Sequence, residues 1–169
     1  MISMSKYCLE LYVTDQGTPY YPTVGTVETP SSDNAGYDLK VVVDQGYTPN
    51  ATLVPLGVKA RLVRYYHMNE HPMNAPPPGD CHFSLEPRSS IYKAGFMMAN
   101  TRGIIDKSYR GELMAPMISV GTQQKTLEAG TRLFQIIAPD MGHIAQVKYV
   151  SSLPETQRGA GGFGSTGLK

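Results

Sequence analysis

The stretch Ala51-Thr-Leu-Val-Pro-Leu-Gly-Val-Lys-Ala-Arg-Leu-Val63 sets the expected fold, because apolar and polar side chains partly alternate along it. A period of two places successive side chains on opposite faces of a strand, and the β-branched residues of this stretch favour that geometry. The segment Ile144-Ala-Gln-Val-Lys-Tyr-Val150 shows the same pattern. Both segments are predicted to be β-strands.

Further strands are predicted where strand-forming residues lie between nearby glycines or prolines. They cover residues 7–13, 37–43, 82–85, 113–118 and 131–138. The one helix candidate is 89–98, which Gly95 interrupts, so helical packing cannot build the core. The chain is therefore predicted to be all-β, a jelly-roll-like sandwich or barrel with at most one short helix.

Composition limits the function classes. A chain of 169 residues suits one domain, and 17 glycines with 13 prolines favour short strands joined by turns. The net charge of +1 gives no general attraction to nucleic acid or to an anionic membrane. The sequence has no apolar run of about 20 residues and no signal peptide, and Cys8 and Cys81 are isolated. We expect a soluble intracellular protein, cytoplasmic with a nuclear location as the alternative.

Two stretches differ from the rest. Residues 65–80 contain Pro72 and the triplet 76–78, which cannot continue a strand, so a surface loop insertion is predicted there. His67, His71 and His82 lie in or beside this stretch and are of a metal-ligand type, but their spacing matches no known zinc pattern, so a solvated or partner-binding loop is favoured over a metal site.

The end of the chain forms the second stretch, Arg158-Gly-Ala-Gly-Gly-Phe-Gly-Ser-Thr-Gly167. A guanidinium, amides free of side-chain bulk and two hydroxyls are the parts of a phosphate cradle. A P-loop is rejected because Ser165 stands at the lysine position. A plain disordered linker is the alternative, but it needs neither Arg158 nor Phe163, and together these favour a nucleotide ligand. Residues 1–157 are thus predicted as the domain and 158–169 as a flexible tail that closes the site.

Five short motifs stand in order along the chain. They are Ala35-Gly-Tyr-Asp-Leu39, Pro87-Arg-Ser-Ser90, Asn100-Thr-Arg-Gly-Ile-Ile-Asp-Lys-Ser-Tyr-Arg-Gly111, Gly130-Thr-Arg-Leu-Phe-Gln-Ile-Ile137 and residues 158–167. Through these motifs the sequence resembles the trimeric dUTPase family. The resemblance implies hydrolysis of dUTP to dUMP and pyrophosphate, which limits uracil in DNA and supplies a thymidylate precursor.

The third motif is expected to carry base and sugar recognition. The resemblance implies a β-hairpin in which Asn100, Gly103 and Ile105 read uracil, while the ring of Tyr109 excludes a 2′-hydroxyl. Asp106 is the expected general base for the water that attacks the α-phosphorus, and Gln135 is the second expected catalytic residue. Taken alone, Asp106 would be interpreted as a turn residue.

The other motifs are expected to neutralise phosphate charge. The resemblance places Mg²⁺ on the triphosphate, with Asp38 contacting the ion through water. Arg88 either contacts the substrate or forms structural ion pairs. The remaining expected substrate-binding residues are Ser89, Ser90, Arg158, Gly161, Gly162, Phe163, Gly164, Ser165 and Thr166.

The resemblance further implies a homotrimer with sites between subunits, in which the tail of one chain closes a site built by others. The substrate is a small molecule, and no direct nucleic-acid or membrane partner is expected. One rival hypothesis is the related dCTP deaminase, against which the third and fifth motifs argue. Another is a regulatory module that binds a protein partner through residues 65–80.

Overall fold

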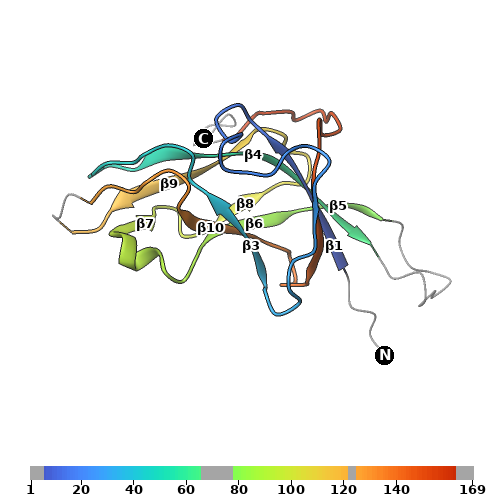
Figure 1. Cartoon of the computed structure of the whole chain (residues 1–169), viewed down its shortest axis with the longest axis horizontal. Helices are drawn as coiled ribbons and strands as arrows, with labels where there is room; N and C mark the ends of the chain where they lie inside the picture. Colours follow the sequence, from blue (N-terminus) through green and yellow to red (C-terminus); the bar gives the residue numbers. More distant parts are fainter. Residues whose placement is uncertain (1–5, 66–77, 122–124, 163–169) are drawn as a thin grey trace, which may run out of the picture.

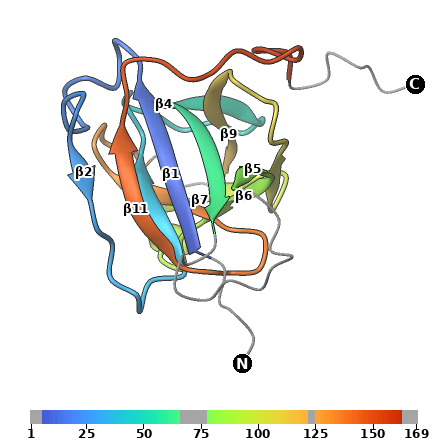
Figure 2. The same cartoon turned by 90° about the vertical axis from the view of Figure 1, so that its right-hand side faces the viewer.

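A computed structural model describes residues 6–65, 78–121 and 125–162 of the chain, which form two β-sheets (Figure 1). The larger sheet contains β1 (Lys6–Val13), β2 (Val27–Glu28), β4 (Thr52–Tyr65), β5 (Gly79–Cys81), β7 (Phe96–Met98), β9 (Glu112–Ser119) and β11 (Ile144–Tyr149). Its order is β2-β11-β1-β4-β9-β7, with β5 also paired to β4. Figure 2 shows β2, β11, β1 and β4 side by side.

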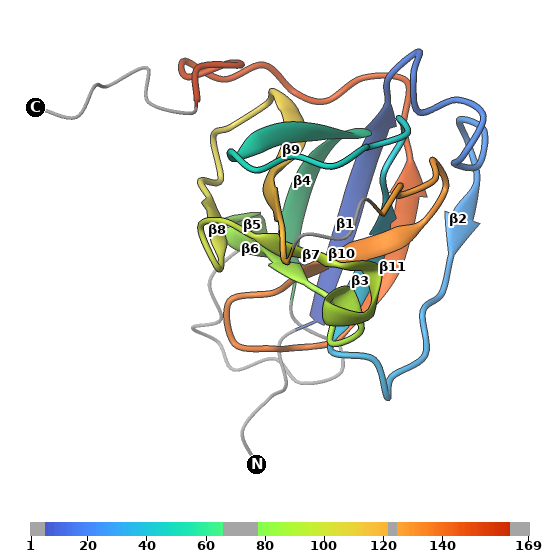
Figure 3. The same cartoon turned by 90° about the vertical axis from the view of Figure 1, so that its left-hand side faces the viewer.

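The smaller sheet contains β3 (Gly36–Lys40), β6 (Phe83–Pro87), β8 (Gly103–Ile105) and β10 (Arg132–Ile137), in the order β3-β10-β6-β8. In Figure 3, β10 and β6 cross in front of the larger sheet. Leu39, Phe134 and Ile136 of this sheet and Leu56 and Leu62 of the larger one are fully buried in one cluster. The apolar faces of the two sheets therefore share a core, and the predicted β-sandwich is confirmed.

Strand β4 is the long strand expected from the alternating stretch, but its alternation fails at Leu56, Gly57 and Val58, which are all buried. The pairing of β4 with β9 shifts register between Pro55 and Lys59. Gly57 has a φ of 68°, a left-handed conformation that L side chains rarely adopt. The bulge at Gly57 thus explains why three successive residues face protein.

Gly57→Ala is expected to lower the free energy of unfolding by about 1–3 kcal/mol, because a new Cβ would overpack this point. That atom would lie 2.6 Å from Val42 Cγ1 and 2.7 Å from Gly17 Cα. Urea unfolding at a fixed protein concentration measures the change. Gly46→Ala is the control, since a Cβ there has no neighbour within 4 Å. Equal midpoints for the two variants would contradict the packing argument.

The helix expected over residues 89–98 is a single 3₁₀ turn, η1 (Ile91–Ala94). It ends at Gly95, whose φ of 79° stops the helix, and the chain continues directly into β7. The prediction of at most one short helix is therefore confirmed, while its span is too long. Gly95 ends the helix at Ala94, four residues before the predicted end at residue 98.

The ends of the predicted loop 65–80 are strand rather than loop. Tyr65 is the last residue of β4, and β5 returns beside β4 with Leu62 opposite Cys81. Residues 66–77 lie outside the described part of the chain. Cys8 is buried and Cys81 is partly buried, and both are free thiols. None of the helices described in the structure is long and apolar enough to cross a membrane.

Candidate active site

A pocket of about 190 Å³ lies between β8 and the loop that follows it. We call the residues of that loop, 106–111, the catalytic loop, after the role that the sequence predicts for Asp106. Seven of the predicted site residues line this first pocket: Asn100, Gly103, Ile105, Asp106, Tyr109, Arg158 and Gly162. The third and fifth motifs, about 50 residues apart in sequence, thus meet in one place. Figure 3 shows the C-terminal segment (red) running back to the side of the molecule that carries β8 and β9.

The expected β-hairpin of the third motif has a different pairing. Strand β8 pairs with β6, in which Leu85 lies opposite Gly103, whereas β7 pairs with β9 in the other sheet. The hairpin prediction is therefore wrong for the described residues. As the last strand in the order β3-β10-β6-β8, β8 has one strand neighbour among the described residues, and all three of its residues line the pocket.

Asp106 lies directly after β8, and its carboxylate is partly exposed. Arg158 donates a hydrogen bond from Nη1 to Asp106 Oδ2, so the described start of the fifth motif rests on the catalytic loop of its own chain. The expectation that the tail of one chain closes a site built by others stays a prediction. Residues Phe163, Gly164, Ser165 and Thr166 lie outside the described residues.

The sequence did not indicate a contact between His82 and Asp106. Phe83 of β6 lies opposite Ile105 of β8, so the residues just outside the two strands are neighbours. His82 Nδ1 is 3.4 Å from Asp106 Oδ1 and accepts the backbone N–H of Lys107 at 3.3 Å. A nitrogen that accepts this N–H is not a donor to Asp106. Only the register of β6 against β8, which the sequence does not specify, would have predicted this contact.

The ring of Tyr109 forms a wall of the first pocket and is only 7% exposed. Its hydroxyl donates to the carbonyl of Glu112 at 3.0 Å, and burial raises its pKa. The guanidinium of Arg158 lies over the ring, 5.8 Å from its centroid. Glycine is required at position 111, because a Cβ there would lie 2.3 Å from the Tyr109 hydroxyl. The ring is therefore held on several sides.

Four more of the expected residues gather in a second pocket, over β3 and β10, whereas Gly161 lines neither pocket. The second pocket is lined by Asp38, Arg88, Ser89 and Gln135 among others. Gln135 donates from Nε2 to the carbonyl of Pro87 at 3.3 Å. A Cβ on Gly36 would lie 2.4 Å from Gln135 Oε1, so this glycine makes room for the amide.

Asp38 is bound by two arginines in the second pocket. Arg88 Nε lies 3.0 Å from Asp38 Oδ1, and Arg132 Nη1 lies 3.4 Å from Oδ2. Arg88 also donates to the carbonyl of Arg132. The structural ion pair that was one alternative for Arg88 is therefore present. Ser90 stands at the N-cap of η1 without a side-chain cap bond and lines neither pocket.

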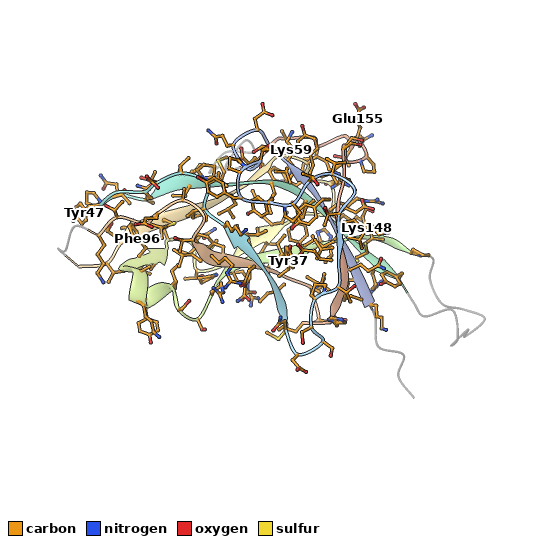
Figure 4. All side chains as sticks on the ribbon, viewed as in Figure 1. Tyr37, Tyr47, Lys59, Phe96, Lys148 and Glu155 are labelled. Carbon is orange, nitrogen blue, oxygen red and sulfur yellow. The ribbon has the colours of Figure 1, made fainter. Side chains whose placement is uncertain are left out.

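A buried hydroxyl network supports the strand that carries Asp38. The Tyr37 hydroxyl donates to Glu28 Oε2 at 2.5 Å and lies 2.6 Å from the Tyr149 hydroxyl. Burial raises the pKa of Tyr149 to about 12, so this group stays protonated at neutral pH. Figure 4 labels Tyr37 near the middle of the molecule, well away from Tyr47 at the end of the sandwich. The network fixes β3 against β2 and β11.

The two pockets share no lining residue. The first pocket lies at β8 and the second at β3, which are the two edge strands of the smaller sheet, and strands β6 and β10 lie between them. The base-reading residues predicted from the third motif, with Arg158 and Gly162, are therefore held at a different place from the predicted phosphate and metal residues Asp38, Arg88, Ser89 and Gln135. Among the described residues, no three His, Cys, Asp or Glu side chains gather to hold a metal ion.

The sequence and the fold were compared with those of known proteins. The family model described as dUTPase matches residues 24–167. A deoxyuridine 5′-triphosphate nucleotidohydrolase of Wolinella succinogenes is 34% identical over 139 residues, 81% of this chain and 83% of that protein. The enzyme of the same name from Rickettsia akari is 35% identical over 145 residues, 83% and 87% of the two chains. The crystal structure of dUTPase from Streptococcus mutans has a TM-score of 0.52 and 25% identity, covering 86% of this chain and 99% of that one. Because the family model extends over most of its length, this chain belongs to the dUTPase family.

Proposed function

We propose that this chain hydrolyses dUTP to dUMP and pyrophosphate by attack of water on the α-phosphorus. The observation that carries the proposal is the first pocket, in which Asn100, Asp106 and Tyr109 line one cavity. The two relatives named deoxyuridine 5′-triphosphate nucleotidohydrolase support the same substrate. The reaction limits uracil incorporation into DNA and supplies dUMP for dTMP synthesis, a role suited to the cytoplasm.

Base recognition follows from the edge position of β8. Its outer edge has no strand partner among the described residues, and its three residues line the pocket, so its backbone groups can pair with the edge of uracil as a strand would. Asn100 adds a side-chain amide. Cytosine presents the opposite pattern of donors and acceptors, and each buried polar group left unpaired costs about 1–3 kcal/mol. The methyl group of thymine is excluded by its size.

Asp106 activates the water. A carboxylate that is 42% exposed can be reached by a water molecule, and its position at the end of β8 keeps it beside the sugar and α-phosphate of a base bound there. Arg158 donates to Asp106 Oδ2. Phosphate oxygens compete for the same guanidinium, so the triphosphate draws Arg158 towards itself and frees the carboxylate.

The second pocket provides the phosphate and metal contacts. Asp38 is a hard oxygen ligand of the kind that Mg²⁺ prefers, and the ion usually keeps several waters beside one or two carboxylates and substrate phosphates. Asp38 therefore fits a contact to Mg²⁺ through water. When bound, Mg²⁺ would neutralise charge on the triphosphate. Gln135 and Ser89 orient polar atoms into the same pocket.

One dUTP needs both pockets, and a single chain holds them apart. A homotrimer in which the first pocket of one subunit faces the second pocket of the next would complete three equal sites. The separation of the two lining sets supports this assembly.

Two inactive variants combined in one trimer are expected to restore about one third of wild-type activity, because each mixed trimer contains one site of three that is built from the intact halves of both chains. Asp106→Asn damages the first pocket and Asp38→Asn the second, so a site built from the intact halves of both works. The two chains are co-expressed with different tags, and doubly tagged trimers are assayed for pyrophosphate release. Mixing Asp106→Asn with Asn100→Ala is the control, because both changes lie in the first pocket. Equal activity in the two mixtures would exclude sites shared between subunits.

A pyrophosphate-release assay with Mg²⁺ tests the proposed reaction. Across the four common deoxynucleoside triphosphates, dUTP and UTP, only dUTP is expected to be hydrolysed efficiently. Ammonia released from dCTP would instead identify the deaminase alternative.

The regulatory alternative is tested by deletion of residues 66–77. This deletion should leave hydrolysis intact and abolish binding of a protein partner. If both hydrolysis and partner binding are unchanged, the insertion has no such role.

A further inference from the structure

Arg110 is the central side chain of the catalytic loop. It is 9% exposed, and its guanidinium donates from Nη1 to the carbonyls of Lys107 at 2.7 Å and Tyr109 at 2.9 Å. Nε donates to the carbonyl of Pro154 at 3.0 Å, and Nη2 to Asp80 Oδ2 at 2.8 Å. One buried cation thus ties the loop to the chain that leads into the fifth motif.

The backbone adds a second connection between the same two segments. The N–H of Arg110 donates to the carbonyl of Gly159 at 2.8 Å, next to Arg158. Thr156 contributes as well, since its hydroxyl donates to the carbonyl of Ser108 at 2.5 Å. Tyr109 on the loop and Arg158 on the C-terminal segment meet across the first pocket only if these two segments keep their relative position.

Asp80 is the only carboxylate that any described hydrogen bond or ion pair gives to Arg110. It belongs to β5, the strand with which the 65–80 insertion returns to the sheet. Its other oxygen accepts from Arg61, which also pairs with Glu10 at 3.0 Å. Burial alone would raise the pKa of Asp80, but the bonds from Arg61 and Arg110 outweigh it and lower the pKa. The carboxylate is therefore charged at neutral pH.

We propose that Asp80 is a positioning residue for the reaction: through Arg110 it holds the catalytic loop and the C-terminal segment so that Tyr109 and Arg158 meet at the first pocket. The inference rests on the proposed function. A buried guanidinium without its counter-charge is costly, and it reorients towards water or another acceptor. The loop carbonyls then lose their fixed donors. The returning strand of the insertion is in this way part of the active-site support.

Asp80→Asn is the test, with Glu10→Gln as the matched control. Both variants remove one carboxylate from Arg61, but only Asp80 contacts Arg110. In the full chain, Asp80→Asn is expected to lower kcat for dUTP by about 10- to 100-fold, as misplaced reacting groups do. It should also lower the preference for dUTP over UTP, because Tyr109 moves. Glu10→Gln should leave kcat and this preference within about twofold, as expected for a partly exposed pair.

Trypsin cleavage after Arg158 provides a measurement that needs no activity. Cleavage should be several-fold faster in Asp80→Asn than in Glu10→Gln, since the segment on either side of Arg158 loses its anchors. If the wild-type chain hydrolyses no nucleotide, the proposed function fails, and the trypsin comparison still decides the positioning role. Equal cleavage in the two variants, or equal kinetics in an active enzyme, would overturn it.

Arg110→Lys covers the case in which Asp80→Asn does not fold. Lysine keeps the charge beside Asp80 but cannot donate in the fixed fork that reaches Lys107, Tyr109 and Pro154 together. It should show the same loss of dUTP preference and the same faster cleavage after Arg158. A folded Arg110→Lys variant with wild-type preference and cleavage would equally overturn the proposal.

Discussion

Replacement of Asp106 by asparagine is expected to lower kcat for dUTP by about 10²–10⁴-fold, the usual contribution of a general base. The amide has nearly the same shape as the carboxylate but cannot take a proton from water. Binding should be retained, because in the proposed mechanism Asp106 activates the water whereas β8 and Asn100 recognise the base. Pyrophosphate release gives kcat, and calorimetry with dUMP gives the affinity of the nucleoside end.

Asp15→Asn is the matched control for this variant. Asp15 is an exposed turn residue that lines neither pocket, so the same chemical change there should leave kcat unaltered. Substantial residual hydrolysis by Asp106→Asn would contradict the assignment of the base. A loss of dUMP affinity as large as the loss of kcat would instead assign Asp106 to substrate binding.

Tyr109→Ala is expected to reduce discrimination against UTP by about 10- to 200-fold, the range for losing a close steric contact in a binding pocket. The ring is nearly buried and forms one wall of the first pocket, so its removal opens space for a 2′-hydroxyl. The ratio of kcat/KM for dUTP to that for UTP measures the effect, and it should fall mainly because UTP becomes a better substrate.

Tyr109→Phe separates the ring from its hydroxyl. Phenylalanine keeps the wall and removes only the hydrogen bond to the Glu112 carbonyl, so discrimination should stay near the wild-type value. Loss of discrimination in Tyr109→Phe, or unchanged discrimination in Tyr109→Ala, would remove the ring from the role of sugar screen.

Local patterns were sufficient to predict most of the large strands. The alternating stretch became β4, and residues 144–150 and 131–138 contain β11 and β10. In the first two of these segments apolar and polar side chains partly alternate with the period of a strand, and this alternation can be seen in the sequence itself. The extent of the helix and of the loop was missed because Gly95 and the pairing of β5 with β4 decide them, and strand pairing is a tertiary choice.

The site divides in a similar way. The motifs predicted Asn100, Asp106 and Tyr109, and the structure brings these residues together in one pocket. The contact of His82 with Asp106 depends on the register of β6 and β8, and the contact of Asp80 with Arg110 joins strand β5 to the catalytic loop. In both contacts the two residues belong to segments that no sequence motif connects, so the sequence alone could not predict that they meet.

The distance between the two pockets has a consequence for the behaviour of the enzyme in dilute solution. If a separate chain carries only half of each site, catalysis belongs to the assembly and obeys mass action. Where trimers are scarce, their share of the chains grows as the square of the total concentration, so a modest fall in expression removes a disproportionate part of the turnover. The amount of protein in a cell would then act as a threshold control on the dUTP pool.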